Sequence, residues 1–100
     1  MLHTVNKSPF EKNSLMTCLR LSLAGSSILM IEDGVYGALK NTQIESFVSQ
    51  SLLNRKVYVL GPDLKARGIE NEELIEGVIV VDYAGFVELA ATNKTVQSWL

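Results

Sequence analysis

The sequence is organised around one stretch, Lys56-Val57-Tyr58-Val59-Leu60-Gly61-Pro62-Asp63-Leu64-Lys65-Ala66-Arg67-Gly68. Its β-branched and aromatic residues favour a strand up to residue 60. Pro62 suits the first turn of a helix, where its missing N–H would be unpaired anyway. Asp63 and Arg67 place charges that complement the helix dipole, and Gly68 suits a C-cap. A strand that leads into a short capped helix is half of a βαβ unit, so the stretch predicts a parallel sheet.

Three more runs predict strands. Residues 2–6 alternate apolar and polar side chains, and residues 78–81 are the most β-like run of the chain. Residues 27–31 form a nearly unbroken apolar run, which is typical of a strand covered on both faces. We expect the strands at 2–6, 27–31 and 56–60 to be the most buried.

The segments between these runs predict helices. The first extends from about residue 11 or 14 to residue 24, with a buried face made of Leu15, Leu19 and Leu23. Residues 42–53 have helical spacing, residues 35–39 suit the start of a short helix, and residues 70–76 suit a helical turn. Asp82 caps a final helix, and residues 96–100 form an apolar-tipped tail.

This order of elements predicts an α/β fold with a single domain over residues 1–100. We expect three α/β/α layers and a small, mainly parallel sheet of about four strands, with helices on both faces. Ligands of such sheets gather beyond the carboxyl ends of the strands. Those ends fall here at residues 7–8, 32–34, 61–63 and 82–83.

Composition narrows the class of protein. The chain has 47% hydrophobic residues, a net charge of −2 and one cysteine. It has no block of Lys and Arg, which argues against nucleic acid as a direct partner. A single cysteine excludes an intrachain disulfide, and no motif indicates a metal or a cofactor. No apolar run is long enough for a membrane span, and the first residues do not resemble a signal peptide. We expect a cytoplasmic protein.

Cys18 is the only thiol and therefore the main candidate for chemistry. A sulfur carrier needs a thiolate, so the pKa and the exposure of the thiol decide its use. Lys12 and Arg20 are close in sequence and are candidates to lower that pKa. The alternative is that Cys18 is a small hydrophobic residue that packs against the apolar face of its helix.

Other polar residues allow two interpretations each. Glu32 and Asp33 suit acid–base chemistry or, more simply, a turn with a helix cap. His3 has no partner ligand nearby in the sequence, which favours a hydrogen-bonded structural role over metal binding. Lys65 and Arg67 suit an acidic partner or plain solvation.

The paired glycines and the C-terminal tryptophan are weaker signals. Gly34 and Gly37 form a GxxG that is too weak for a phosphate loop. Trp99 either packs against its own domain or anchors an interface.

Four blocks of the sequence together resemble the DsrH/TusB family, and the likeness is closer to its DsrH branch. The blocks occur in the family's order and span nearly the whole chain: Leu2-His3-Thr4-Val5-Asn6-Lys7-Ser8-Pro9-Phe10, Glu32-Asp33-Gly34-Val35-Tyr36-Gly37-Ala38, Val57-Tyr58-Val59-Leu60-Gly61-Pro62-Asp63-Leu64-Lys65-Ala66-Arg67-Gly68 and Asp82-Tyr83-Ala84-Gly85-Phe86-Val87. Members of the DsrH branch carry a cysteine in the first helix, and Cys18 matches that position.

The resemblance implies a DsrE-like fold and a place in a heterohexamer with DsrE/TusD-like and DsrF/TusC-like subunits. Such complexes relay persulfide sulfur to a DsrC/TusE-like acceptor, and the main acceptor cysteine belongs to the DsrE/TusD-like chain. The Dsr branch serves sulfur oxidation, whereas the Tus branch serves 2-thiolation of the tRNA wobble uridine.

Three hypotheses follow. In the first, Cys18 is the catalytic residue of a sulfur relay subunit in sulfur oxidation. In the second, the chain is a non-catalytic structural subunit of a TusBCD-like complex that serves tRNA thiolation. A third, more remote hypothesis is a stand-alone domain that binds a small ligand at the strand ends.

Overall fold

The computed structural model describes residues 1–100 and has a parallel sheet at its centre. The sheet has the order β4-β3-β2-β1-β5, and every neighbouring pair of strands is parallel. Its strands are β1 (Leu2–Val5), β2 (Ser27–Met30), β3 (Lys56–Leu60), β4 (Ile79–Val81) and β5 (Val96–Trp99).

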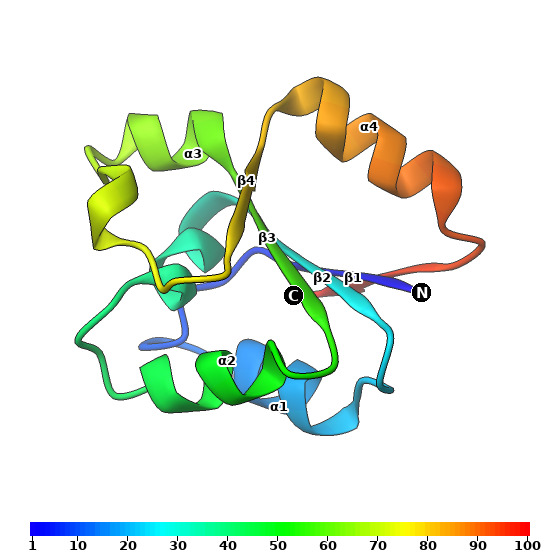
Figure 1. Cartoon of the computed structure of the whole chain (residues 1–100), viewed down its shortest axis with the longest axis horizontal. Helices are drawn as coiled ribbons and strands as arrows, with labels where there is room; N and C mark the ends of the chain where they lie inside the picture. Colours follow the sequence, from blue (N-terminus) through cyan, green and yellow to red (C-terminus); the bar gives the residue numbers. More distant parts are fainter.

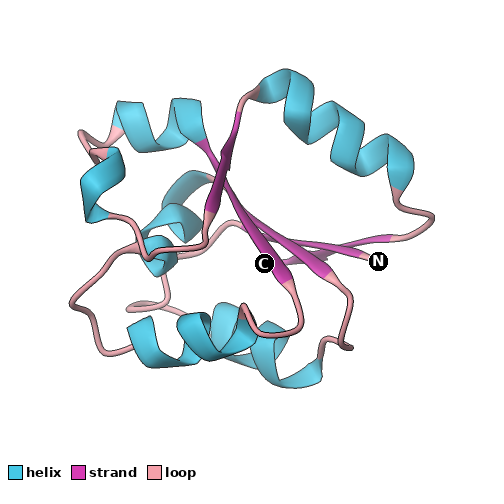
Figure 2. Ribbon diagram, viewed as in Figure 1, coloured by secondary structure: helices cyan, strands magenta, loops and turns pink.

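Helices lie on both sides of this sheet, so the predicted three-layer α/β/α architecture is confirmed (Figures 1 and 2). On one side lie α1 (Ser14–Leu21) and α2 (Glu45–Ser51), and on the other lie α3 (Gly61–Ala66) and α4 (Tyr83–Thr92). Two 3-10 helices, η1 (Glu32–Ala38) and η2 (Asn71–Glu73), complete the chain. None of the helices is long and apolar enough to pass through a membrane.

The three central strands are the most buried, as the sequence predicts. All four residues of β1 are buried, and β2 and β3 are buried at most positions. Val5, Met30 and Val59 belong to the main hydrophobic core, whereas Leu2 and Leu29 are fully buried outside it. Because side chains alternate between the two faces of a strand, this pattern means that both faces of the sheet are covered.

The stretch at residues 56–68 forms the predicted strand and capped helix. α3 follows β3 directly and begins at Gly61, one residue before Pro62. Pro62 lies in its first turn, and Leu64 is buried in the core. Gly68 has a φ of +67°, the left-handed conformation that a glycine C-cap supplies at low cost.

The sheet has one strand more than the four predicted, because residues 96–99 form β5 instead of a tail. β5 pairs with β1 along its whole length. The Trp99 indole N–H donates a hydrogen bond to His3 Nδ1 at 3.0 Å, and the Thr4 hydroxyl donates to Ser98 Oγ at 3.2 Å. Trp99 also packs against the core, so it is tucked against its own domain.

Several helix bounds differ from the prediction. α1 ends at Leu21 and the chain is extended at Ser22, so Leu23 is 79% exposed instead of lying on the buried face. α2 is shorter than the predicted 42–53, because residues 42–44 form a turn before it. The short helix expected at 35–39 is part of η1, which begins at Glu32 where only a turn was expected.

Gly34 allows η1 to approach β1 closely. A Cβ atom at this position would lie 2.1 Å from the carbonyl oxygen of Val5, which is backbone and cannot move aside cheaply. We expect Gly34→Ala to lower the free energy of unfolding by about 3 kcal/mol or more. Gly25→Ala is the control, because that site has open space and only a strained φ of +88°; it should cost about 1 kcal/mol. Equal losses of unfolding free energy in the two variants, measured by urea unfolding, would contradict this packing.

His3 makes the stability of the fold dependent on pH. Burial lowers the pKa of His3 below 6.5, and the N-terminal ammonium group and Arg55 act in the same direction. The stability that neutral His3 contributes is complete above pH 6.5 and is lost as pH falls through the lowered pKa. We expect the free energy of unfolding to fall between about pH 7 and about pH 5 by more in the wild type than in His3→Gln. An equal fall of the free energy of unfolding with pH in the two proteins, measured by urea unfolding, would show that His3 is not responsible.

Candidate functional site

Cys18 lies on the inner side of α1. Leu15 and Cys18 are the two residues of this helix that are fully buried, and both belong to the main core. They are three residues apart, so they lie on one side of the helix and face the sheet. The thiol of Cys18 is free and has no exposed surface in this chain.

The surroundings of Cys18 keep its thiol protonated. Burial raises the pKa of Cys18 to about 12, and the weaker attraction of the Arg55 guanidinium acts in the opposite direction. The cation that influences the thiol is therefore Arg55, not Lys12 or Arg20 as sequence proximity suggested. At neutral pH only about one thiol in 10⁵ is ionised when the pKa is about 12. A neutral, buried thiol is a poor nucleophile.

Arg55 is a site residue that sequence reasoning missed. Its guanidinium donates a hydrogen bond to Ser22 Oγ at 2.8 Å, one to the Ser22 carbonyl oxygen and one to Asn54 Oδ1 at 2.8 Å. Ser22 directly follows α1, so Arg55 satisfies a carbonyl at the helix end and complements the negative end of its dipole. The only sequence signal is the basic pair Arg55-Lys56 at the start of β3.

The carboxyl ends of β2 and β3 come together as predicted. Asp63 Oδ2 accepts a hydrogen bond from the Glu32 backbone N–H at 2.6 Å, so its carboxylate caps the start of η1. Arg67 forms an ion pair with Asp33 at 2.8 Å. Asp33 and Asp63 are thus both used in local contacts, and the arrangement favours the interpretation of a turn with a helix cap over acid–base chemistry.

The other residues singled out from the sequence are placed apart from this cluster. Asp82 caps α4 by accepting a hydrogen bond from the Gly85 backbone N–H at 2.8 Å. His3 has the predicted hydrogen-bonded structural role through Trp99, while its Nε2 atom is buried without a partner. The structure brings together no group of three or more His, Cys, Asp or Glu side chains that can hold a metal ion.

The outer side of α4 is an exposed apolar surface. Phe86, Leu89 and Ala90 are its less exposed apolar residues. Tyr83 and Val87 on the outer side are 60% and 67% exposed. They are joined there by two exposed alanines, Ala84 and Ala91. We call these four residues the α4 surface. Exposed apolar side chains that are aligned along a helix indicate a site of protein contact.

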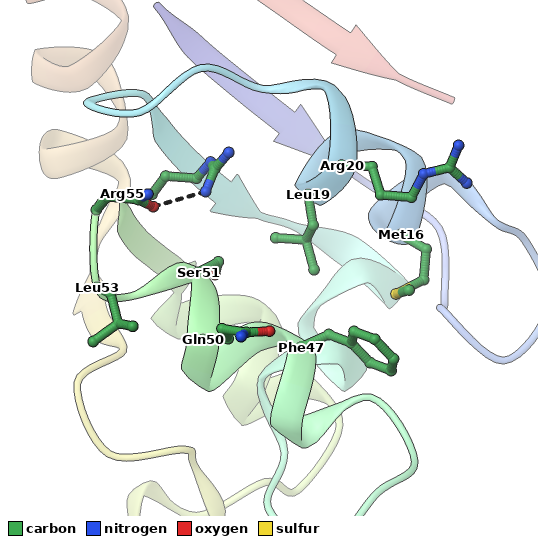
Figure 3. A pocket seen from close by; sticks show the side chains of 9 residues that line it. Met16, Leu19, Arg20, Phe47, Gln50, Ser51, Leu53 and Arg55 are labelled. Atoms are coloured by element: carbon green, nitrogen blue, oxygen red, sulfur yellow. Dashed lines mark hydrogen bonds between the residues drawn. The ribbon is translucent and has the colours of Figure 1, made fainter.

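A groove separates α1 and α2 on the opposite side of the molecule (Figure 3). It has a volume of about 420 Å³, and we call it the α1–α2 groove. Leu19 points from α1 toward α2, and Phe47 lies across from Met16 (Figure 3). Arg20 and Arg55 lie on its rim.

Comparison with known proteins places the chain in a family. Residues 7–96 match the family described as "DsrH like protein". Protein TusB of Erwinia tasmaniensis is 36% identical over 99 residues, which cover 99% of this chain and all of that protein. Protein TusB of Escherichia coli K12 is 34% identical over 100 residues, with the same coverage.

Solved structures share the fold. The Escherichia coli ychN protein superposes with a TM-score of 0.81 and 20% identity, and the match covers 97% of each chain. Protein MTH1491 of Methanobacterium thermoautotrophicum, described as of unknown function, has a TM-score of 0.77 at 17% identity, covering 97% of this chain and 95% of that one. The family match, the full-length relatives and the fold agree, and the chain therefore belongs to the DsrH/TusB family of sulfur relay subunits.

Proposed function

We propose that this chain is a non-catalytic subunit of a cytoplasmic TusBCD-like heterohexamer that serves 2-thiolation of the tRNA wobble uridine. In this role it packs against TusC-like and TusD-like subunits and helps to shape the surface that receives a TusE-like sulfur acceptor. The persulfide forms on a cysteine of the TusD-like chain. The relatives named Protein TusB support the thiolation pathway over sulfur oxidation.

The burial of Cys18 is the observation that carries this proposal. A sulfur carrier must present a thiolate to a donor and then present the outer sulfur to an acceptor. Cys18 has no exposed surface and a pKa of about 12, so in the folded chain it meets neither requirement. A small apolar residue that fills a core position accounts for both properties.

The α4 surface supports the role of a subunit. A ten-residue helix with no buried residue contributes little to the core of its own domain. The neighbouring edge strand β4 also exposes Ile79 and Val80, at 43% and 41%. An apolar helix face beside an unpaired strand edge is stabilised when a partner subunit covers it.

The second candidate function is persulfide transfer by Cys18 in a DsrEFH-like complex for sulfur oxidation, with a DsrC-like acceptor. Two features favour it. Cys18 lies in α1, and the charge of Arg55 partly offsets the increase in thiol pKa that burial causes. In that reaction the Cys18 thiolate attacks the sulfane sulfur of a donor persulfide. The new S–S bond leaves the persulfide on Cys18, and the donor leaves as its thiolate. This candidate needs α1 to move and expose the thiol.

Intact mass after treatment with a sulfane-sulfur donor separates the two functions. We expect no gain on this chain in its co-expressed complex and a gain of about 32 Da on the TusD-like subunit. A gain of that size on this chain that disappears on reduction and in Cys18→Ala would favour the persulfide-carrying role.

Cys18→Ala and Cys18→Ser form a matched pair for the same question. Alanine keeps the core apolar, whereas serine buries a hydroxyl at a cost of about 1–3 kcal/mol. The non-catalytic role predicts full tRNA thiolation per assembled complex in both variants, with lower stability in Cys18→Ser. Normal assembly with abolished thiolation in Cys18→Ala would contradict it.

Charge on the α4 surface should weaken assembly. Val87→Glu places a carboxylate in the middle of this exposed apolar face, where an interface would have to desolvate it. We expect co-purification with the TusC-like and TusD-like subunits to be lost or to fall about tenfold or more. Ser46→Glu, at an exposed position of α2, is the control and should leave assembly unchanged. If both variants assemble like the wild type, the α4 surface is not a subunit interface.

A further inference from the structure

A long hollow runs along α1 and α2 and past the start of β3, and its middle part is shown in Figure 3. The α1–α2 groove is its middle part. A cavity of about 190 Å³ shares Met16 and Phe47 with the groove and extends it to Phe10. A cavity of about 570 Å³ shares Arg55 with the groove and extends past Lys56, at the start of β3, to Leu89 and Thr92 of α4. Three adjoining cavities make a hollow that suits a peptide segment better than a small molecule.

The charges along this hollow are all of one sign. Arg20, Arg55 and Lys56 are the charged residues that line it, and no Asp or Glu lines any of the three cavities. The chain as a whole has 11 acidic residues and a net charge of −2, so this distribution is not that of the average surface. The one ion pair of the structure, Arg67 with Asp33, lies elsewhere.

Arg55 is held in place before any ligand arrives. Its contacts with Ser22 and Asn54 use three of the five N–H groups of a guanidinium, and all three acceptors are neutral. The remaining two N–H groups have no acceptor in the chain. A fixed guanidinium loses little conformational freedom when it binds a carboxylate.

The end of the hollow near Phe10 is apolar. Its cavity has no charged lining residue, and Phe10 itself is 56% exposed. Met16 and Phe47 continue this apolar wall into the groove. Apolar side chains of a ligand would remove this surface from water, and carboxylates of the same ligand would meet the cations farther along the hollow.

We infer that this hollow is a docking site for a segment of a partner protein that carries both apolar side chains and carboxylates. The α1–α2 groove shares no lining residue with the α4 surface. The inference goes beyond the proposed function and does not depend on it. The groove favours a peptide over RNA, because the apolar lining that Met16, Leu19 and Leu53 contribute has no ring on which a base can stack.

Peptide selection on the full-length chain tests this inference. A random peptide display library is selected against the purified chain, and the enriched peptides are synthesised with a fluorescent label for anisotropy titrations. We expect enriched sequences in which Asp or Glu flanks apolar residues, and binding that weakens as salt is raised.

Matched double variants then locate the site. R20Q/K56Q removes two cations of the hollow, and K40Q/K65Q removes two exposed lysines outside it, with the same change of net charge. We expect R20Q/K56Q to weaken peptide binding about tenfold or more, while K40Q/K65Q stays within about twofold. Phe47→Ser should also weaken peptide binding, because it removes an apolar side chain that lines the hollow.

Three results would overturn the inference. One is enrichment of peptides without acidic residues, or no enrichment at all. Another is an equal loss of binding in the two double variants, which would mean that the peptides respond only to net charge. The third is tighter binding of a single-stranded RNA oligonucleotide that displaces the peptide, which would assign the hollow to nucleic acid.

Discussion

The structure depends on the packing of α1 against the sheet at β1 and β5. Leu15 and Cys18 reach the sheet and are fully buried, together with Val5, Ile28 and Met30 of the strands. β1 also holds the edge strand β5 in the sheet, because β2 pairs with one of its edges and β5 with the other. A helix that covers this strand cannot easily lift its inner residues toward solvent, because well-packed cores resist local opening. The same contact that completes the fold therefore buries the only thiol of the chain.

Much of the fold could be predicted because local signals agreed with one another. Gly61, Pro62 and Gly68 bound a helix directly after a β-branched run, and the observed α3 begins and ends within two residues of that prediction. β5 could not be predicted in the same way. It has four residues, half of them polar, and its strand conformation comes from pairing with β1 and from the Trp99–His3 hydrogen bond, both of which join distant parts of the sequence. The prediction that Leu23 lies on the buried face was wrong for a similar reason, because the helical spacing continues past Leu21 although the helix ends there.

The candidate site shows the same division between local and distant information. The resemblance to the DsrH/TusB family identified the class of protein, and spacing identified Cys18 as a residue on the border of an apolar face. Its environment depends on Arg55, which is 37 residues away and reaches Ser22 at the end of α1. The basic pair Arg55-Lys56 before a strand does not indicate which distant residue Arg55 contacts. Arg55 therefore has two roles in the structure. Its hydrogen bond to Ser22 holds the end of α1, and its positive charge faces a groove with no acidic residue.

The central claim is that Cys18 is a core residue and not a sulfur carrier, and native-state alkylation tests it most directly. The rate of reaction of Cys18 with iodoacetamide is measured at increasing urea concentrations below the unfolding transition, in the chain alone and in its complex. The account predicts that the free energy for exposing the thiol equals the global free energy of unfolding and falls with the same urea dependence. Fast alkylation that does not change with urea would mean that α1 presents the thiol through a small local motion, and it would contradict the account.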